Sequence, residues 1–95
     1  MLIVQKYGGS SVADKSRIMN VASRIAEAYK EGNELVVVVS AQGDTTDELL
    51  KAAADINPEA SERELDMIIS TGEQQSAALM AMALNGMGIP AISLN

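Results

Sequence analysis

The stretch Leu35-Val36-Val37-Val38-Val39 decides the fold class of this chain. An unbroken run of β-branched and aliphatic residues is typical of a strand buried on both faces, as in parallel sheets that helices cover on each side. A second apolar run, over residues 2–4, predicts another strand that ends near Lys6. A third strand is expected over residues 90–94, which have the sequence Pro-Ala-Ile-Ser-Leu.

Helices are expected between these strands. The first covers about residues 15–31, with Asp14 as its N-cap and Gly32 at its C-terminal end. A short helix then begins with Thr45 or Thr46 as its cap. The inward face of the first helix follows from helical spacing and consists of Ile18, Val21, Ala22, Ile25 and Tyr29.

A third, long helix is expected to begin at Ser61, after the Asn-Pro pair at 57–58 has ended the second, and to finish within residues 85–88. Its inward face at helical spacing consists of Leu65, Ile68, Ile69, Gly72, Ser76, Leu79 and Ala83.

The element order is therefore β-α-β-α-α-β. Strands that alternate with helices predict right-handed crossovers and an α/β fold, a Rossmann-like three-layer arrangement of a parallel sheet with helices on both faces. Three parallel strands alone would leave long unpaired edges, which proteins normally cover or extend. Because the chain stops at Asn95, directly after an apolar run, we expect it to be the first part of a larger domain.

Composition narrows the class of function. The 95 residues include 7 basic and 13 acidic side chains, a net charge of −6, which argues against nucleic acid as a partner. The chain has no Cys and no His, so it offers no disulfide, zinc–thiolate site, thiol nucleophile or imidazole base. No apolar run approaches the roughly 20 residues of a membrane span, and no signal peptide is evident. These features fit a cytoplasmic protein without a membrane partner.

The stretch KYGGSS, residues 6–11, follows the first predicted strand. Glycines let a backbone approach a phosphate closely, backbone N–H groups can cradle it, and Lys adds a positive charge. The stretch matches neither GxxxxGK[ST] nor GxGxxG. Taken alone it is better explained as a glycine turn beside an exposed Lys.

Two further segments are expected near this stretch, because ligands of open parallel sheets bind beyond the carboxyl ends of the strands. The second strand leads to Ser40 and then Thr46. The long helix contains Gly72, which costs roughly 1 kcal/mol relative to Ala in a helix and so needs a reason such as close backbone approach. The next residue, Glu73, could accept hydrogen bonds from a cationic ligand group. The plainer alternatives are an N-cap for Thr46 and a solvated helix position for Glu73.

Taken together and in this order, the segments resemble the aspartate kinase family. That family opens with K-[FY]-G-G-[ST]-S and V-A-D, here residues 6–11 and 12–14. Its second strand ends in V-V-S-A, here residues 38–41, and a threonine segment follows, here residues 46–49. Its long helix carries G-E, here residues 72–73. Acetylglutamate, glutamate 5-, carbamate and uridylate kinases are expected to share only the K-x-G-G element.

The resemblance implies an amino-acid-kinase fold and transfer of phosphate from ATP to L-aspartate. Lys6 would be catalytic, beside an Mg²⁺ ion that the nucleotide phosphates hold and for which this chain offers no ligand set. Tyr7 replaces the commoner Phe of the family, which should not matter if the ring only packs. The residues implied for ATP phosphates are Lys6, Tyr7, Gly8, Gly9 and Ser10. The residues implied for the aspartate pocket are Ser40, Thr46 and Glu73.

The resemblance also implies that residues 1–95 are the N-terminal portion of an amino-acid-kinase catalytic domain and are inactive alone. The nucleotide-base and regulatory segments would follow. The complete protein would be a homo- or hetero-oligomer with L-aspartate and ATP as small-molecule substrates, acting at the first step of lysine, threonine and methionine biosynthesis. The alternatives are another amino-acid kinase with a different acceptor, or a non-catalytic small-molecule-binding module.

Overall fold

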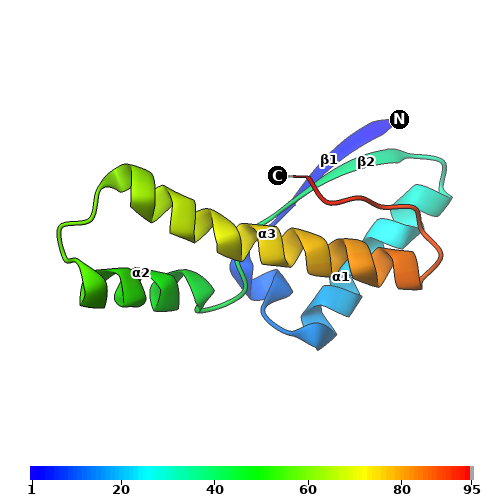
Figure 1. The fold of residues 1–95 in the computed structure, drawn as a ribbon. Coiled ribbons are helices and arrows are strands. Elements are labelled where there is room, and N and C mark those ends of the chain that lie inside the picture. Colours follow the sequence, from blue (N-terminus) through cyan, green and yellow to red (C-terminus); the bar gives the residue numbers. More distant parts are fainter. Residues whose placement is uncertain (95) are drawn as a thin grey trace.

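A computed structural model of the chain describes residues 1–94, which form two strands, a short 3-10 turn and three α-helices (Figure 1). The strands lie together at the back of the view, and α3 is the longest helix. None of the helices in this part of the chain is both long and apolar enough to cross a membrane. The elements are β1 (Leu2–Tyr7), η1 (Gly9–Val12), α1 (Lys15–Lys30), β2 (Glu34–Val39), α2 (Thr45–Ile56) and α3 (Glu62–Gly86).

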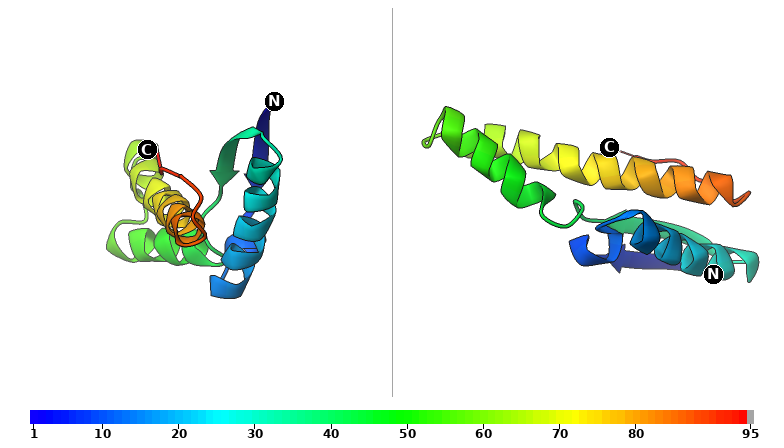
Figure 2. Two further views of the ribbon diagram at one scale, coloured as in Figure 1. Left: turned by 90° about the vertical axis from the view of Figure 1, so that its right-hand side faces the viewer. Right: turned by 90° about the horizontal axis from the view of Figure 1, so that it is seen from below.

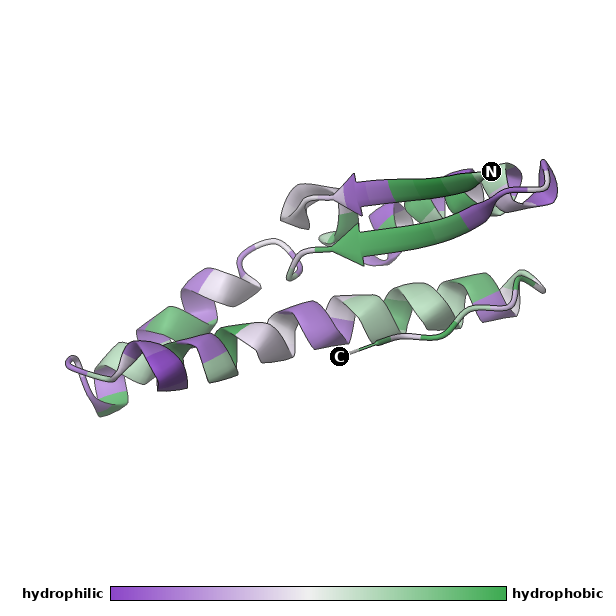
Figure 3. Ribbon diagram, turned by 90° about the horizontal axis from the view of Figure 1, so that it is seen from above, coloured by the Kyte–Doolittle hydropathy of each residue, from purple (hydrophilic) through white to green (hydrophobic). Residues whose placement is uncertain are grey.

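The two strands pair in parallel, in a register that runs from Leu2 opposite Glu34 to Tyr7 opposite Val39. Both arrowheads therefore end at the same edge of the sheet (Figure 3). The α/β class and the parallel pairing predicted from the apolar run at 35–39 are confirmed. This pairing brings the loop after β1 next to the loop after β2.

The core lies between one face of the sheet and two helices, α1 and α3, which contact each other and β2 (Figure 2). Alternate strand residues point into it, because successive side chains of a strand face opposite sides. α2 extends beyond the sheet and packs against the first part of α3. The buried core residues are Val12, Ile18, Val21, Ala22, Ile25, Ala26, Val39, Met80, Leu84 and Ile89.

The opposite face of the sheet is apolar and exposed. Leu2 and Val4 are 62% and 66% exposed, and Val36 and Val38 are 49% and 46% exposed. Both α1 and α3 pack on the other face, so the second helical layer of a three-layer fold does not lie within residues 1–94. The valine run therefore has the composition of a strand that is covered on both faces. Within residues 1–94, only one of its faces is covered.

The third predicted strand is wrong for this structure, because residues 90–94 pair with no strand. The segment is held to the end of α3 instead: Ile89 is 5% exposed, and the backbone N–H of Ala91 donates to Asn85 Oδ1 at 3.2 Å. An apolar crevice of about 500 Å³, lined on one side by Leu35 and Val37, separates the segment from β2. The backbone groups of the segment consequently do not reach the free edge of the sheet.

The helix ends follow the sequence with one exception. Asp14 caps α1, with its Oδ1 accepting from the N–H of Arg17 at 2.9 Å, and Gly32 ends the helix with a φ of +93°. Ser61 caps α3 and accepts from the N–H of Glu64 at 3.4 Å. The predicted threonine cap of α2 is wrong, since both threonines at 45–46 are helical and the preceding aspartate holds the cap position without a side-chain hydrogen bond.

The predicted inward faces need two corrections. Leu79 is 39% exposed, whereas Met80 is buried. The reason is that α3 packs on α2 in its first half and on α1 in its second, so its buried face changes along the helix. Tyr29 is 41% exposed because it lies near the end of α1, beside the open crevice. The fully buried line of α3 is Gly72, Ser76, Met80 and Leu84.

Candidate active site

The loops that follow β1 and β2 contact each other through their backbones. The N–H of Gly43 donates to the carbonyl of Gly9 at 3.1 Å, and the N–H of Ser40 donates to the carbonyl of Tyr7 at 3.1 Å. The prediction that these loops are neighbours is confirmed. The contact follows from the parallel pairing, since carboxyl ends of parallel strands share one edge.

The two glycines of the first loop have different surroundings. A Cβ at Gly9 would lie 2.7 Å from the carbonyl oxygen of Ala41, so only glycine allows the loops to approach this closely. A Cβ at Gly8 would meet nothing within 4 Å. Packing therefore explains Gly9, whereas Gly8 leaves an open approach to the backbone.

Three successive backbone N–H groups in this loop remain available. Within residues 1–94, the N–H groups of Gly8, Gly9 and Ser10 donate to no carbonyl, while Ser11 donates to the carbonyl of Gly8 at 3.1 Å. Unpaired N–H groups beside open space suit the oxygens of an anion. The local backbone thus fits a phosphate group.

The two residues before the glycines point to opposite faces of the sheet. Lys6 is exposed on the outer face and forms no ion pair with the described residues. Tyr7 packs its ring against the core, and its hydroxyl donates to Gln5 Oε1 at 3.1 Å. The side chain of Tyr7 is thus committed to packing, and only its backbone lies at the predicted phosphate segment.

Each residue predicted for the acceptor pocket is next in the chain to a residue in a close contact between α3 and the segment that follows β2. A Cβ at Gly72 would lie 2.9 Å from Ala41 Cβ and 3.2 Å from Thr45 Cγ2. A close approach does explain the glycine in mid-helix, but the atoms that approach belong to side chains and not, as predicted, to another backbone. Thr46 and Glu73 are the next residues along the chain from this contact; the first is half-buried and the second exposed.

The two hydroxyl groups of α3 that precede Gly72 already donate to backbone carbonyls of their own helix. Ser70 Oγ donates to the carbonyl of Met67 and Thr71 Oγ1 donates to the carbonyl of Ile68, both at 2.7 Å. Ser40, by contrast, is half-buried at the end of β2, and its hydroxyl is in none of the hydrogen bonds of the described residues. The three residues predicted for the acceptor pocket thus come from three separate segments, the end of β2, α2 and α3.

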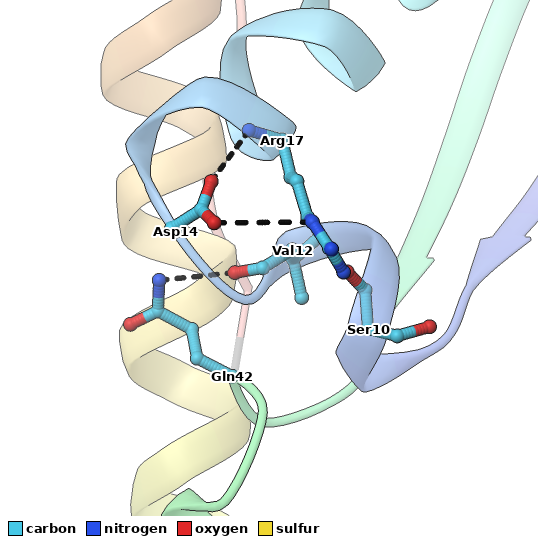
Figure 4. Close-up of polar contacts among 5 residues, drawn as sticks. All are labelled: Ser10, Val12, Asp14, Arg17 and Gln42. Carbon is cyan, nitrogen blue, oxygen red and sulfur yellow. Dashed lines mark hydrogen bonds and ion pairs between the residues drawn. The ribbon is translucent and has the colours of Figure 1, made fainter.

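Three polar contacts around the loop were missed by sequence reasoning (Figure 4). Arg17 donates from its guanidinium to the carbonyl of Ser10 at 2.7 Å, and its Nε lies 3.8 Å from Asp14 Oδ2. Gln42 donates from Nε2 to the carbonyl of Val12 at 3.0 Å. The i,i+3 spacing of Asp14 and Arg17 was a usable signal. No local signal links Gln42 to Val12, which is 30 residues away along the chain.

Across residues 1–94, no cluster of three or more acidic side chains is arranged to hold a metal ion.

Comparison with known sequences shows the class of protein. The sequence model described as the amino acid kinase family matches residues 1–95, and the chain belongs to that family. Within the family the chain is similar to aspartokinases. It is 56% identical over 92 residues to the aspartokinase of Mycolicibacterium smegmatis and 54% identical over 93 residues to that of Geobacillus stearothermophilus.

These matches cover almost all of this chain but a small part of the relatives. They include 97% and 98% of the chain and 22% and 23% of the two relatives, so the chain spans about a fifth of their length. The crystal structure of aspartate kinase from Synechocystis is 53% identical, with a TM-score of 0.96, and the match covers 99% of this chain and 16% of that one. The arrangement of β1, β2 and the three helices is therefore that of the corresponding part of an aspartate kinase.

Proposed function

We propose that residues 1–95 are the N-terminal portion of the catalytic domain of an aspartokinase. The complete enzyme would transfer the γ-phosphoryl group of ATP to the side-chain carboxylate of L-aspartate and release 4-phospho-L-aspartate and ADP. The observation that carries the proposal is the 53–56% identity to aspartokinases over nearly the whole chain. Two contacts support it: the phosphate-compatible loop is hydrogen-bonded to the loop after β2, and α3 approaches Ala41 of that loop at Gly72, the residue before Glu73.

On the phosphate side, this chain supplies charge and backbone donors. ATP brings the phosphoryl group, together with Mg²⁺ held mainly through its phosphates. The N–H groups of Gly8, Gly9 and Ser10 bind phosphate oxygens, and Lys6 neutralises charge on the phosphoryl group as it is transferred. Lys6 has no competing ion pair among the described residues, so its ammonium is available for this role.

On the acceptor side, the chemistry needs no general base. The acceptor is already a carboxylate, so a chain without His is no obstacle. Glu73 pairs with the substrate ammonium, the hydroxyl of Thr46 donates to a substrate carboxylate, and Ser40 lines the same pocket. Catalysis then depends on holding the carboxylate in line with the phosphoryl group.

The wider role follows from the same proposal. Phosphorylation of aspartate would be the first step of lysine, threonine and methionine biosynthesis, in the cytoplasm, by a homo- or hetero-oligomeric complete protein. Its partners would be the two small-molecule substrates, and the net charge of −6 argues against nucleic acid as a partner.

The test uses the complete protein that contains residues 1–95. ADP formation is measured with L-aspartate and, in parallel, with N-acetylglutamate, glutamate, carbamate and UMP as acceptors. Turnover that depends on L-aspartate, with phosphate recovered on the aspartate side chain, supports the proposal. Turnover with another acceptor alone would assign the chain to a different member of the family, and ligand binding without turnover would make it a non-catalytic module.

A further inference from the structure

The loop of residues 40–44 contacts both halves of the proposed site. On one side its backbone hydrogen-bonds to Gly9, and Gln42 donates its side-chain amide to the carbonyl of Val12 at 3.0 Å (Figure 4). On the other side Ala41 packs against Gly72 of α3, directly before Glu73. The loop therefore connects the phosphate segment to the acceptor residues.

The contact made by Gln42 has a particular place in this connection. Val12 is the last residue of the η1 turn and is 0% exposed, so the turn is anchored in the core at this point. The carbonyl groups at the end of a helical turn lack partners within the turn and need one elsewhere. Gln42 supplies that partner, and the contact is partly buried. Arg17 holds the same turn from its exposed side through Ser10.

We propose that Gln42 is a positioning residue for phosphoryl transfer, an inference that rests on the proposed function. Its amide fixes the Gly9–Val12 turn against the loop that leads to Thr46, and so sets the separation between the phosphate donors and the acceptor pocket. Gln42 itself contacts neither substrate. A small displacement of two reacting groups can cost about 10²-fold in rate even when the altered residue is remote from the chemistry.

The test compares two substitutions in the complete protein. Gln42→Met keeps the length of the side chain and removes the donor. Asn33→Leu is the matched control, because Asn33 Nδ2 also donates to a backbone carbonyl, that of Ala28 at 2.9 Å, in a partly buried contact at the opposite end of β2. We expect Gln42→Met to lower kcat by about 10- to 100-fold. The KM values for ATP and aspartate should stay within about 2-fold, because each substrate keeps its own binding groups.

Asn33→Leu should leave kcat unchanged while lowering the melting temperature, as a purely structural contact would. An unchanged kcat in Gln42→Met, or an equal loss in Asn33→Leu, would overturn the positioning role. Amide hydrogen exchange of residues 8–13 gives a readout that is independent of activity, and Gln42→Met should accelerate it. If the unaltered protein fails to phosphorylate aspartate, the proposed function fails. Unchanged exchange would then separately refute the claim that Gln42 holds the turn.

Discussion

At the scale of single residues, the site depends on two charges that nothing else in the described chain neutralises. Lys6 and Glu73 are both exposed, and neither takes part in an ion pair among residues 1–94. An exposed unpaired charge contributes little to stability. Replacing either residue should therefore affect the reaction and leave the fold intact.

Lys6→Ala in the complete protein should mainly lower turnover, because the positive charge is most useful when charge develops on the transferred phosphoryl group. We expect a loss of about 10²–10³-fold in kcat, as for removal of one transition-state donor. Steady-state kinetics measure it, with Lys30→Ala at the exposed end of α1 as the control. Turnover near that of the unaltered protein would show that Lys6 is an ordinary surface residue.

Glu73→Gln should weaken aspartate binding more than ATP binding, since it removes the charge opposite the substrate ammonium. Loss of one partner of a desolvated pair costs about 2–5 kcal/mol. The KM for aspartate should rise strongly while the KM for ATP changes little. Glu62→Gln, an exposed position in the first turn of the same helix, is the control. An unaltered KM for aspartate contradicts the assignment.

At the scale of elements, the site depends on how closely two loops and one helix approach. A parallel pair of strands delivers both loops to one edge, and glycine permits the contacts at Gly9 and Gly72. Any other residue at position 72 would place its Cβ 2.9 Å from Ala41 Cβ. Glycine lowers helix propensity by roughly 1 kcal/mol relative to alanine, and this is the cost of bringing α3 against the second loop.

Gly9→Ala and Gly8→Ala form a matched pair. A Cβ added at position 9 would lie 2.7 Å from the backbone oxygen of Ala41, which cannot move aside as the end of a flexible side chain can. A Cβ added at position 8 would meet nothing within 4 Å. Gly9→Ala should destabilise the protein by about 1–3 kcal/mol, and Gly8→Ala by no more than about 0.5 kcal/mol. Thermal unfolding of the complete protein measures both. Equal melting temperatures for the two variants would show that the loops can move apart at position 9 without loss of stability.

At the scale of the whole molecule, the sheet has an apolar face without cover. The side chains of Leu2, Val4, Val36 and Val38 are 46–66% exposed, and the view coloured by hydropathy shows β2 as an almost continuous apolar ribbon (Figure 3). Exposed apolar patches mark interaction surfaces or aggregation. In the complete protein we expect further chain to cover this face.

Residues 1–95 expressed alone should not act as a kinase and should self-associate. They would supply the acceptor side and one wall of the phosphate side, and their two-stranded sheet has open edges and one bare face. Light scattering, aspartate-dependent ADP formation and calorimetric titration with ATP test this. A stable monomer that binds ATP tightly or turns over would show that the catalytic unit is smaller than proposed.

Local sequence determined most of the elements, and the family resemblance of its motifs indicated the candidate site residues. Hydrophobic period, caps and glycines placed β1, β2 and the three helices, because these signals act within a few residues of one another. The resemblance of the motif segments to aspartate kinases indicated Lys6, Thr46 and Glu73. Only the tertiary structure decided how these pieces meet, since such contacts join residues far apart in the chain. It placed the ring of Tyr7 against the core and the side-chain amide of Gln42 against the carbonyl of Val12. It also left residues 90–94 outside the sheet. The sequence could not have shown this, because no local signal tells whether an apolar segment finds a strand to pair with.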